Sequence, residues 1–262
     1  MPRYAPGMTE RTAVGVDPDG VQRFAAAWTA FENAVDWSLL GRLHCDEGGD
    51  DFFAPSDREA LFEAGLRFAE DLGTLLSPGG TTLWLGASVA ECVPLLAATL
   101  VGGRHAQWFE REGPVLAELE RGLEAAEAAC ERSLPRPRYG APRELARGSC
   151  DHLWAVSVFT DPDAFPALHD QLYDRRKGPL ATRRGSLPEE RRRADELVRD
   201  ALQALESPGL LSTTDEELAL FAPQCELRGR ELVVPEEGRL SAIVGDTVRH
   251  CRVVATSPRR SR

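Results

Sequence analysis

The chain has 262 residues, 42% of them hydrophobic, and carries a net charge of −11 at pH 7. The length suits one α/β domain with helical additions, and the apolar content is enough for a full core. The negative charge argues against nonspecific binding to nucleic acid or to anionic membranes. No apolar stretch is long enough to span a bilayer, and the first residues lack the apolar core of a secretory signal, so we expect a cytoplasmic protein.

The spacing of cysteine and histidine argues against a metal site. The six cysteines are scattered and none stands in a CxxC pair, which favours reduced thiols over a zinc site or a disulfide framework. The five histidines show no metal-ligand spacing either. The chain has one lysine, Lys177, among its many arginines, a bias that indicates a GC-rich bacterial genome. We therefore expect a bacterial protein without a metal ion.

The chain is predicted to begin with a flexible lead over residues 1–19. Residues 20–80 are predicted to form a helical segment that packs on or covers the core. Ser56 and Glu59 have the spacing of a capping box, which predicts that a second helix of this segment starts there. In the first helix, apolar residues recur every three or four positions, as one buried helix face requires: Val21, Phe24, Trp28, Phe31 and Val35.

Strands and helices alternate from residue 81 onward. Short apolar strands are expected at residues 81–86, 105–110, 152–159 and 209–213, with a less regular one near 138–145. Helices fit the segments between them, near residues 89–100, 114–133, 162–173 and 186–205, with a short one ending at Phe221. This alternation is typical of right-handed βαβ units. It predicts an open, mostly parallel sheet flanked by helices, in which residues 82–85, 105–109 and 153–159 are parallel neighbours or near neighbours.

The C-terminal part changes character. Residues 225–234 and 240–254 are predicted to be β-structure, with Gly245 and Asp246 as a two-residue hairpin turn. An antiparallel hairpin would thus complete a domain over residues 81–256, and residues 257–262 would form a polar tail.

The segment TTLWLGASVAECVPLL, residues 81–96, resembles the first motif of class I S-adenosylmethionine-dependent methyltransferases, a strand followed by a small-residue turn and a helix. The family's turn is typically Gly-x-Gly-x-Gly, and the same positions here hold Gly86, Ser88 and Ala90. Small side chains are needed because the backbone must approach the cofactor. The resemblance therefore implies a Rossmann-like fold in which Gly86, Ala87 and Ser88 contact S-adenosylmethionine.

Acidic residues beyond the turn extend the resemblance. Glu110 ends the second predicted strand, where the family has a carboxylate that accepts hydrogen bonds from both ribose hydroxyls. Glu144 is the candidate for the acid that contacts the adenine. Asp161 follows the fourth predicted strand, whose carboxyl end faces the methyl group and the substrate in this family. His169, on the next predicted helix, is the candidate general base.

Each candidate also has a structural interpretation. Gly86 fits a plain turn between a strand and a helix, and Glu110 fits a solvated charge at a strand end. Asp161 fits a cap on the following helix. His169 fits a structural histidine, which is the commoner role. The residues alone leave these alternatives open.

A basic segment spans residues 175–193, with seven arginines and Lys177 but only two acids. In an acidic chain such a segment creates a local positive field, which favours recognition of an anionic group on a substrate or a protein partner. The other interpretation places the arginines at 191–193 on a solvated helix face, paired with nearby carboxylates.

The sequence favours an S-adenosylmethionine-dependent methyltransferase that acts on a small molecule, by in-line transfer promoted by proximity and orientation. The second hypothesis is a catalytically inactive member of this fold that serves as a binding or scaffold subunit. The degenerate turn favours it, as does Trp84, which stands where the family often has an acid. A nicotinamide-binding domain fits poorly, because Ser88 and Glu91 replace the later glycines of its motif. A nucleophile elbow and a phosphate-binding loop are both missing from the sequence, so hydrolase and NTPase functions lack support.

Overall fold

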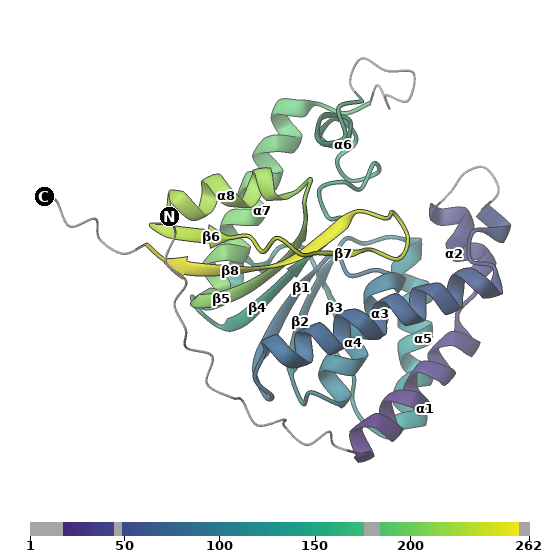
Figure 1. Ribbon diagram of the computed structural model, residues 1–262. Coiled ribbons are helices and arrows are strands. Elements are labelled where there is room, and N and C mark those ends of the chain that lie inside the picture. Colours follow the sequence, from purple (N-terminus) through teal and green to yellow (C-terminus); the bar gives the residue numbers. More distant parts are fainter. Residues whose placement is uncertain (1–17, 45–48, 176–183, 257–262) are drawn as a thin grey trace, which may run out of the picture.

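Figure 1 shows the computed structural model of the protein, which describes residues 18–44, 49–175 and 184–256. One sheet runs through the middle of the molecule, and helices lie on both of its faces (Figure 1). The tail at 257–262 and all but the last two residues of the predicted lead at 1–19 lie outside the described residues. No described helix is long and apolar enough to cross a membrane.

The sheet is mostly parallel, as predicted. Its strands follow the order β3-β2-β1-β4-β5-β8-β6, and β7 pairs with β8 off this path. Pairing is parallel from β3 to β5, whereas β8 runs antiparallel to both β5 and β6. The strands are β1 (Thr81–Leu85), β2 (His105–Glu110), β3 (Pro137–Tyr139), β4 (Cys150–Ala155), β5 (Leu205–Thr214), β6 (Arg230–Val233), β7 (Arg239–Leu240) and β8 (Thr247–Ala255).

The three segments predicted to be parallel neighbours are confirmed as such, with β1 between β2 and β4. β4 ends at Ala155, so residues 156–159 lie beyond the strand and belong to the loop that follows it. β3 covers only the first part of the segment predicted near 138–145, because a short 3-10 helix begins at Pro142.

Helices cover both faces of the sheet. The first five helices, α1 through α5, pack in one apolar cluster against the face that carries Trp84. A second cluster holds α6, α7 and α8 against the opposite face. The helices are α1 (Pro18–Ala34), α2 (Trp37–His44), α3 (Pro55–Leu75), α4 (Val89–Leu100), α5 (Pro114–Cys130), α6 (Pro166–Leu172), α7 (Leu187–Ala204) and α8 (Leu218–Glu226), with 3-10 turns η1 (Gly49–Asp51) and η2 (Pro142–Glu144).

Three tryptophans form a row across the centre of the sheet. The strand register places Trp84 opposite both Trp108 and Trp154, so all three lie on the same face. Each is at most 1% exposed, and the rings of Trp84 and Trp154 are 5.1 Å apart between centroids. Phe68 of α3 meets Trp154 edge-on at 5.4 Å. The N-terminal helices therefore share one core with the sheet.

A chain of polar side chains crosses the same face from β1 to β8. His152 Nε2 lies 2.8 Å from Ser212 Oγ, which lies 2.7 Å from His250 Nδ1, and His152 Nδ1 lies 3.3 Å from Thr82 Oγ1. Burial lowers the pKa of His152 well below its usual range, so the ring is neutral. Buried polar groups need such partners, and these also fix the register of four neighbouring strands.

Helix α1 packs along α5 and α4, and α3 packs along α4. Phe31 of α1 is fully buried at the contact with α5. A Cβ atom at Gly122 of α5 would lie 2.6 Å from the ring of Phe31, so glycine is what allows the two helices to approach this closely.

The capping box predicted at Ser56 and Glu59 is wrong. Helix α3 begins at Pro55, with Ala54 as its N-cap and no side-chain cap. Proline suits the first position of a helix because its missing N–H needs no partner there.

The C-terminal β-structure also differs in detail. Residues 241–246 join β7 to β8, and the Ser241 amide donates to the Asp246 carbonyl at 2.8 Å, so the two-residue turn at Gly245 and Asp246 is wrong. Helix α8 continues to Glu226, which reduces the strand predicted over residues 225–234 to β6. Leu220, Phe221 and Cys225 recur at helical spacing and fill the second core, which outweighs the local preference for a strand.

We expect Phe31→Ala to lower the free energy of unfolding by about 3–5 kcal/mol, because it leaves a cavity between α1 and α5 that the neighbours fill only in part. Val21 lies on the same helix but is 43% exposed. Val21→Ala should therefore change stability by about 0.5 kcal/mol or less. Urea unfolding followed by tryptophan fluorescence measures both. Equally small effects would show that α1 does not belong to the cooperative core.

Candidate active site

The carboxyl ends of β1, β2 and β4 lie at one edge of the sheet. In an open parallel sheet, ligands bind outside the carboxyl ends of the strands, at the point where the strand order reverses. Here the order reverses at β1, because β2 and β3 lie on one side of it and β4 and β5 on the other. A cleft of about 1410 Å³ opens at this edge. The loops after all three strands line it, together with the end of α2 and part of the loop between β7 and β8.

Gly86 forms the turn that leads from β1 toward α4. Its φ of +63° lies in the left-handed region that favours glycine. Its amide donates to the Phe109 carbonyl of β2 at 3.0 Å, and a Cβ atom here would lie 3.1 Å from Val158 in the loop after β4. Gly86 and Ser88 line the cleft, whereas Ala87 is fully buried and is not among the described lining residues.

Ser88 and Glu91 close the start of α4. The amide and hydroxyl of Ser88 donate to Glu91 Oε2 at 2.9 and 3.0 Å, and the Glu91 amide donates to the Ser88 carbonyl at 3.1 Å. Glu91 is buried, which raises the pKa of its carboxyl. Ser-x-x-Glu is the spacing of a capping box, so the sequence contains the signal that identifies Glu91.

Glu110 ends β2 and lines the cleft, half-buried. Its Oε1 accepts the amide of Arg111 at 2.7 Å. Burial raises the pKa of Glu110 to about 7; the Arg111 amide opposes this shift, and the charge of Glu91 adds to it. A carboxyl group with a perturbed pKa in a cleft is a candidate for ligand contact. Its partial burial fits this role better than that of a solvated charge.

Glu217 holds the loop that follows β4. Its buried carboxyl accepts the Phe159 amide at 2.6 Å, the Ser157 amide at 3.2 Å and the Thr213 hydroxyl at 3.2 Å. Burial raises the pKa of Glu217 to about 7, although these hydrogen bonds act in the opposite direction. Thr214 and Glu217 have the spacing of a capping box, but nothing local in the sequence indicates the contact with Phe159, which is 58 positions away.

Asp161 lies in the loop after β4 and lines the cleft. Its Oδ1 accepts the Asp163 amide at 2.8 Å, and its Oδ2 lies 3.6 Å from Arg111. Helix α6 starts later, at Pro166, with Phe165 as its N-cap, so the Asp161 side chain does not cap that helix. It instead links the loop after β4 to the residue that follows β2.

His169 lies on α6 and also lines the cleft, but both of its ring nitrogens have partners. Nδ1 lies 2.6 Å from the Thr160 carbonyl, and Nε2 lies 3.2 Å from Nη1 of Arg175. A carbonyl can only accept and a guanidinium can only donate, so the ring carries its proton on Nδ1 and accepts at Nε2. A base at Nε2 would have to release Arg175 first. The arrangement therefore favours a positioning role over the predicted catalytic one.

Glu144 is not brought to the cleft. It lies in η2, is exposed, and is not among the described residues that line the cleft. After β3 the chain turns at Gly140, where φ is +105°, and η2 packs against α7. Tyr139 and Gly140 line the cleft where Glu144 was expected. In the described structure, Glu144 therefore lies apart from the cleft that holds Gly86 and Glu110.

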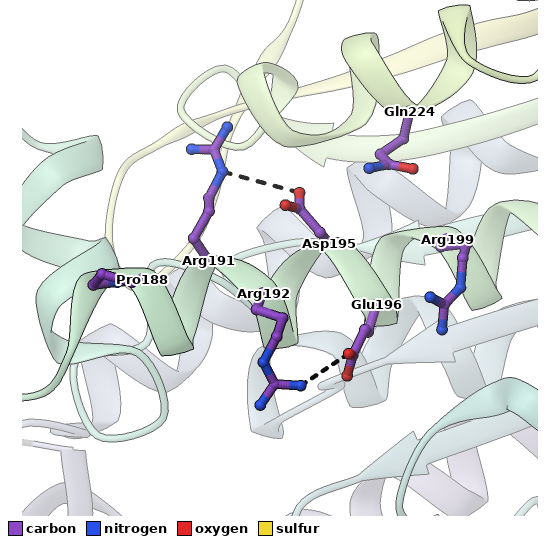
Figure 2. A pocket seen from close by; sticks show the side chains of 7 residues that line it. All are labelled: Pro188, Arg191, Arg192, Asp195, Glu196, Arg199 and Gln224. Atoms are coloured by element: carbon purple, nitrogen blue, oxygen red, sulfur yellow. Dashed lines mark hydrogen bonds and ion pairs between the residues drawn. The ribbon is translucent and has the colours of Figure 1, made fainter.

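A smaller pocket of about 430 Å³ lies between α7 and α8, and Figure 2 shows the side chains that line it. Arg191 lies 3.9 Å from Asp195, and Arg192 lies 2.9 Å from Glu196, both along α7. Such exposed i,i+4 pairs contribute only a few tenths of a kcal/mol. Of the predicted basic segment, residues 176–183 lie outside the described part of the chain. No strand end lines this pocket, so we place the candidate site in the larger cleft.

The cleft thus brings together Gly86, Ser88, Glu110, Asp161 and His169, and it adds Glu91. Gly86 lets a ligand approach the backbone, and the half-buried carboxyl of Glu110 can accept hydrogen bonds, so the cleft suits a ligand that carries hydroxyl groups. Among the described residues, no cluster of three or more His, Cys, Asp or Glu side chains could hold a metal ion.

No family model matches the sequence, and no curated protein matches it. Solved structures do. TYW2 of Pyrococcus horikoshii in complex with MeSAdo is 10% identical, with a TM-score of 0.45 over 74% of this chain and 62% of that chain, so this chain spans less than two-thirds of its length. A methyltransferase from Pyrococcus furiosus is 15% identical, with a TM-score of 0.43 over 72% of this chain and 81% of that chain. Precorrin-6y C5,15-methyltransferase from Geobacter metallireducens is 13% identical, with a TM-score of 0.40 over 74% and 88%.

The strand order decides the fold. Parallel strands in the order β3-β2-β1-β4-β5 are followed by β8, which is inserted antiparallel between β5 and β6. This is the Rossmann-like methyltransferase fold. Gly86 and Glu110, which the resemblance predicts to contact the cofactor, both lie at the edge formed by the carboxyl ends of the parallel strands.

We expect the stability difference between the wild type and Glu217→Gln to depend on pH. Burial raises the pKa of Glu217 from 4.5 to about 7, so between these values the folded protein keeps a proton that the unfolded chain has released. The stability of the wild type relative to the variant should therefore fall by about 1–3 kcal/mol between pH 4.5 and 7, and then level off. Urea unfolding across this range measures it. The exposed Glu226→Gln is the control, and parallel curves for wild type and Glu217→Gln would contradict the burial argument.

Proposed function

We propose that the protein is an S-adenosylmethionine-dependent methyltransferase that acts on a small molecule. The observation that carries the proposal is the cleft at the carboxyl ends of β1, β2 and β4, with the turn at Gly86 and the carboxyl of Glu110 in its lining. Its volume of about 1410 Å³ exceeds the roughly 300–1000 Å³ that is typical of a pocket for one ligand. Room for a nucleoside cofactor and a second small molecule supports a transfer between two bound ligands.

The lining residues fit this cofactor. The turn at Gly86 lets the backbone approach a ligand, because no side chain intervenes. In the described structure only Oε1 of Glu110 has a hydrogen-bond partner, which leaves Oε2 to accept from ribose hydroxyls. S-adenosylmethionine is a sulfonium cation. The carboxyl groups of Glu91, Glu110 and Asp161 line the cleft, and the charges of Glu91 and Asp161 both act on Glu110. Opposite charges attract more strongly at a partly buried site than in water.

When bound, the cofactor would supply an electrophilic methyl group. Gly86 and Glu110 would hold its nucleoside part, and the loop that carries Asp161 would form the adjoining wall. Glu217 would keep that loop in place through the amides of Ser157 and Phe159. In-line transfer depends on alignment more than on acid–base chemistry, so it suits a cleft whose histidine at position 169 is already engaged.

One observation favours the second candidate, a catalytically inactive binding or scaffold subunit. The Glu91 carboxyl lies against the turn and already takes the amide and the hydroxyl of Ser88. Those two donors are therefore not offered to a ligand at the position where the family has its second glycine. The next experiment separates the two candidates.

We expect S-adenosylmethionine and S-adenosylhomocysteine to bind the wild type in calorimetry. Glu110→Ala should weaken binding by about 1–3 kcal/mol, because two ribose hydroxyls lose their acceptor. Glu144→Ala removes the same kind of side chain outside the cleft and should leave the affinity unchanged. No heat of binding to the wild type at a cofactor concentration of about 1 mM would exclude any useful affinity and would favour the scaffold candidate.

Cofactor affinity should rise with pH between about 6 and 8, because the pKa of Glu110 is raised to about 7 and its carboxyl must ionise to accept from both hydroxyls. Binding should accordingly release a proton below pH 7. Calorimetry in two buffers with different ionisation enthalpies measures this proton. Glu110→Gln cannot ionise, so its pH dependence reports the titration of the ligand alone and is subtracted from that of the wild type. The same pH slope in both proteins would show that Glu110 does not contact the ribose.

A further inference from the structure

Arg175 follows α6 and lines the cleft. Its backbone is fixed by the end of the helix: the Arg175 amide donates to the Asp170 carbonyl at 2.7 Å, and the Asp174 amide donates to the Gln171 carbonyl at 3.2 Å. These two bonds form a Schellman motif, and Asp174 takes the left-handed conformation that the motif requires, with φ at +52°. The motif turns the chain back toward α6, so Arg175 lies beside the last turn of that helix.

Two neighbours hold the side chain of Arg175. Nη1 lies 3.2 Å from Nε2 of His169, whose tautomer is set by the Thr160 carbonyl. The guanidinium carbon lies 4.8 Å from the centroid of the Tyr173 ring, and the Tyr173 hydroxyl donates in turn to Asp246. A guanidinium stacked on an aromatic ring and bonded at one nitrogen has lost most of its rotational freedom before any ligand arrives.

The charge of Arg175 is not neutralised by the described protein. Two of the three other described arginines that line the cleft are paired with carboxylates: Arg111 lies 3.6 Å from Asp161, and Arg192 lies 2.9 Å from Glu196. The third, Arg193, donates to the Ala164 carbonyl at 3.1 Å, and its guanidinium lies over the Phe165 ring. Among the described residues, no carboxylate forms an ion pair with Arg175, and its only side-chain hydrogen bond is to a neutral ring nitrogen. Most of its N–H donors therefore have no partner among the described residues of the cleft.

We propose that Arg175 binds an oxyanion of the substrate, a carboxylate or a phosphate group. The identification of the bound molecule as the substrate rests on the proposed function, whereas the anion site itself does not. A guanidinium presents its donors in a planar fork that matches both groups. The carboxyl groups of Glu91, at the start of α4, and Glu110, at the end of β2, line the part of the cleft where the cationic cofactor is proposed to bind. One cleft would thus hold a cation near the acids and an anion at Arg175, and the methyl acceptor is a small acidic molecule.

The test uses the full chain, labelled with ¹⁵N, and two probes, inorganic phosphate and malonate, at constant ionic strength. Arginine Nε–H signals are followed by NMR, and the Arg175 signal is the one missing from Arg175→Lys. We expect it to shift saturably with at least one probe. Arg175→Lys keeps the charge but loses the fork, and it should bind that probe about tenfold more weakly. Arg192→Lys is the matched control, because its guanidinium lines the same cleft but is paired, and it should bind like the wild type.

Tighter binding of phosphate would indicate a phosphate monoester as substrate, and tighter binding of malonate a carboxylate. A shift of the Arg175 signal that never saturates, or equal affinities for the wild type and Arg175→Lys, would overturn the proposal. If Arg175→Lys folds poorly, Arg175→Gln takes its place, both to assign the signal and to measure the loss of affinity. Cofactor calorimetry is independent: binding of S-adenosylmethionine without either anion removes only this inference, whereas an anion site without cofactor binding removes the proposed methyl transfer and leaves the site standing.

Discussion

The parallel pairing of β1 with both β2 and β4 is the constraint on which the candidate site depends. Because the three strands run in one direction, their carboxyl ends meet at one edge, and the loops that follow them share a single cleft. A slip of one residue would move every side chain of a strand to the other face. The row of Trp84, Trp108 and Trp154 would then leave the core, at a cost of several kcal/mol for each large ring. The hydrogen-bonded side chains of Thr82, His152, Ser212 and His250 require the same register.

Carboxyl groups do two different tasks around the cleft. Glu91 and Glu217 are buried and take the backbone amides of the loops after β1 and β4. Several hydrogen bonds to one buried carboxyl can hold a loop that has no regular structure of its own. Glu110 has one oxygen without a partner in the described structure, so it is the carboxyl that a ligand can use. The raised pKa values of Glu110 and Glu217 have the same main cause, burial, and only the hydrogen bonding separates their roles.

The end of α6 supplies the opposite charge. A carbonyl at Thr160 sets the tautomer of His169, which holds Arg175 over Tyr173. These contacts occupy both ring nitrogens of His169, and they also orient the Arg175 guanidinium in the cleft. The cleft thus has acidic groups at the strand ends and a held guanidinium after α6, an arrangement suited to two ligands of opposite charge.

The sequence by itself determined the parts that depend on local pattern. Alternating apolar strands and amphipathic helices are typical of right-handed crossovers, so β1, β2 and β4 could be predicted to be parallel neighbours or near neighbours, whereas their order came from the structure. Gly86 and Glu110 could be found because each follows directly from the strand that ends beside it. Glu144 lies away from the cleft because β3 is short and the chain turns at Gly140. The contacts of Glu217 and Arg175 were decided only by the tertiary structure. Glu217 accepts amides 58 and 60 positions away, and Arg175 is oriented by the end of α6 and by the His169 ring, which the Thr160 carbonyl holds. Contacts of this kind leave no periodicity in the chain, because packing brings the groups together only after the sheet has formed.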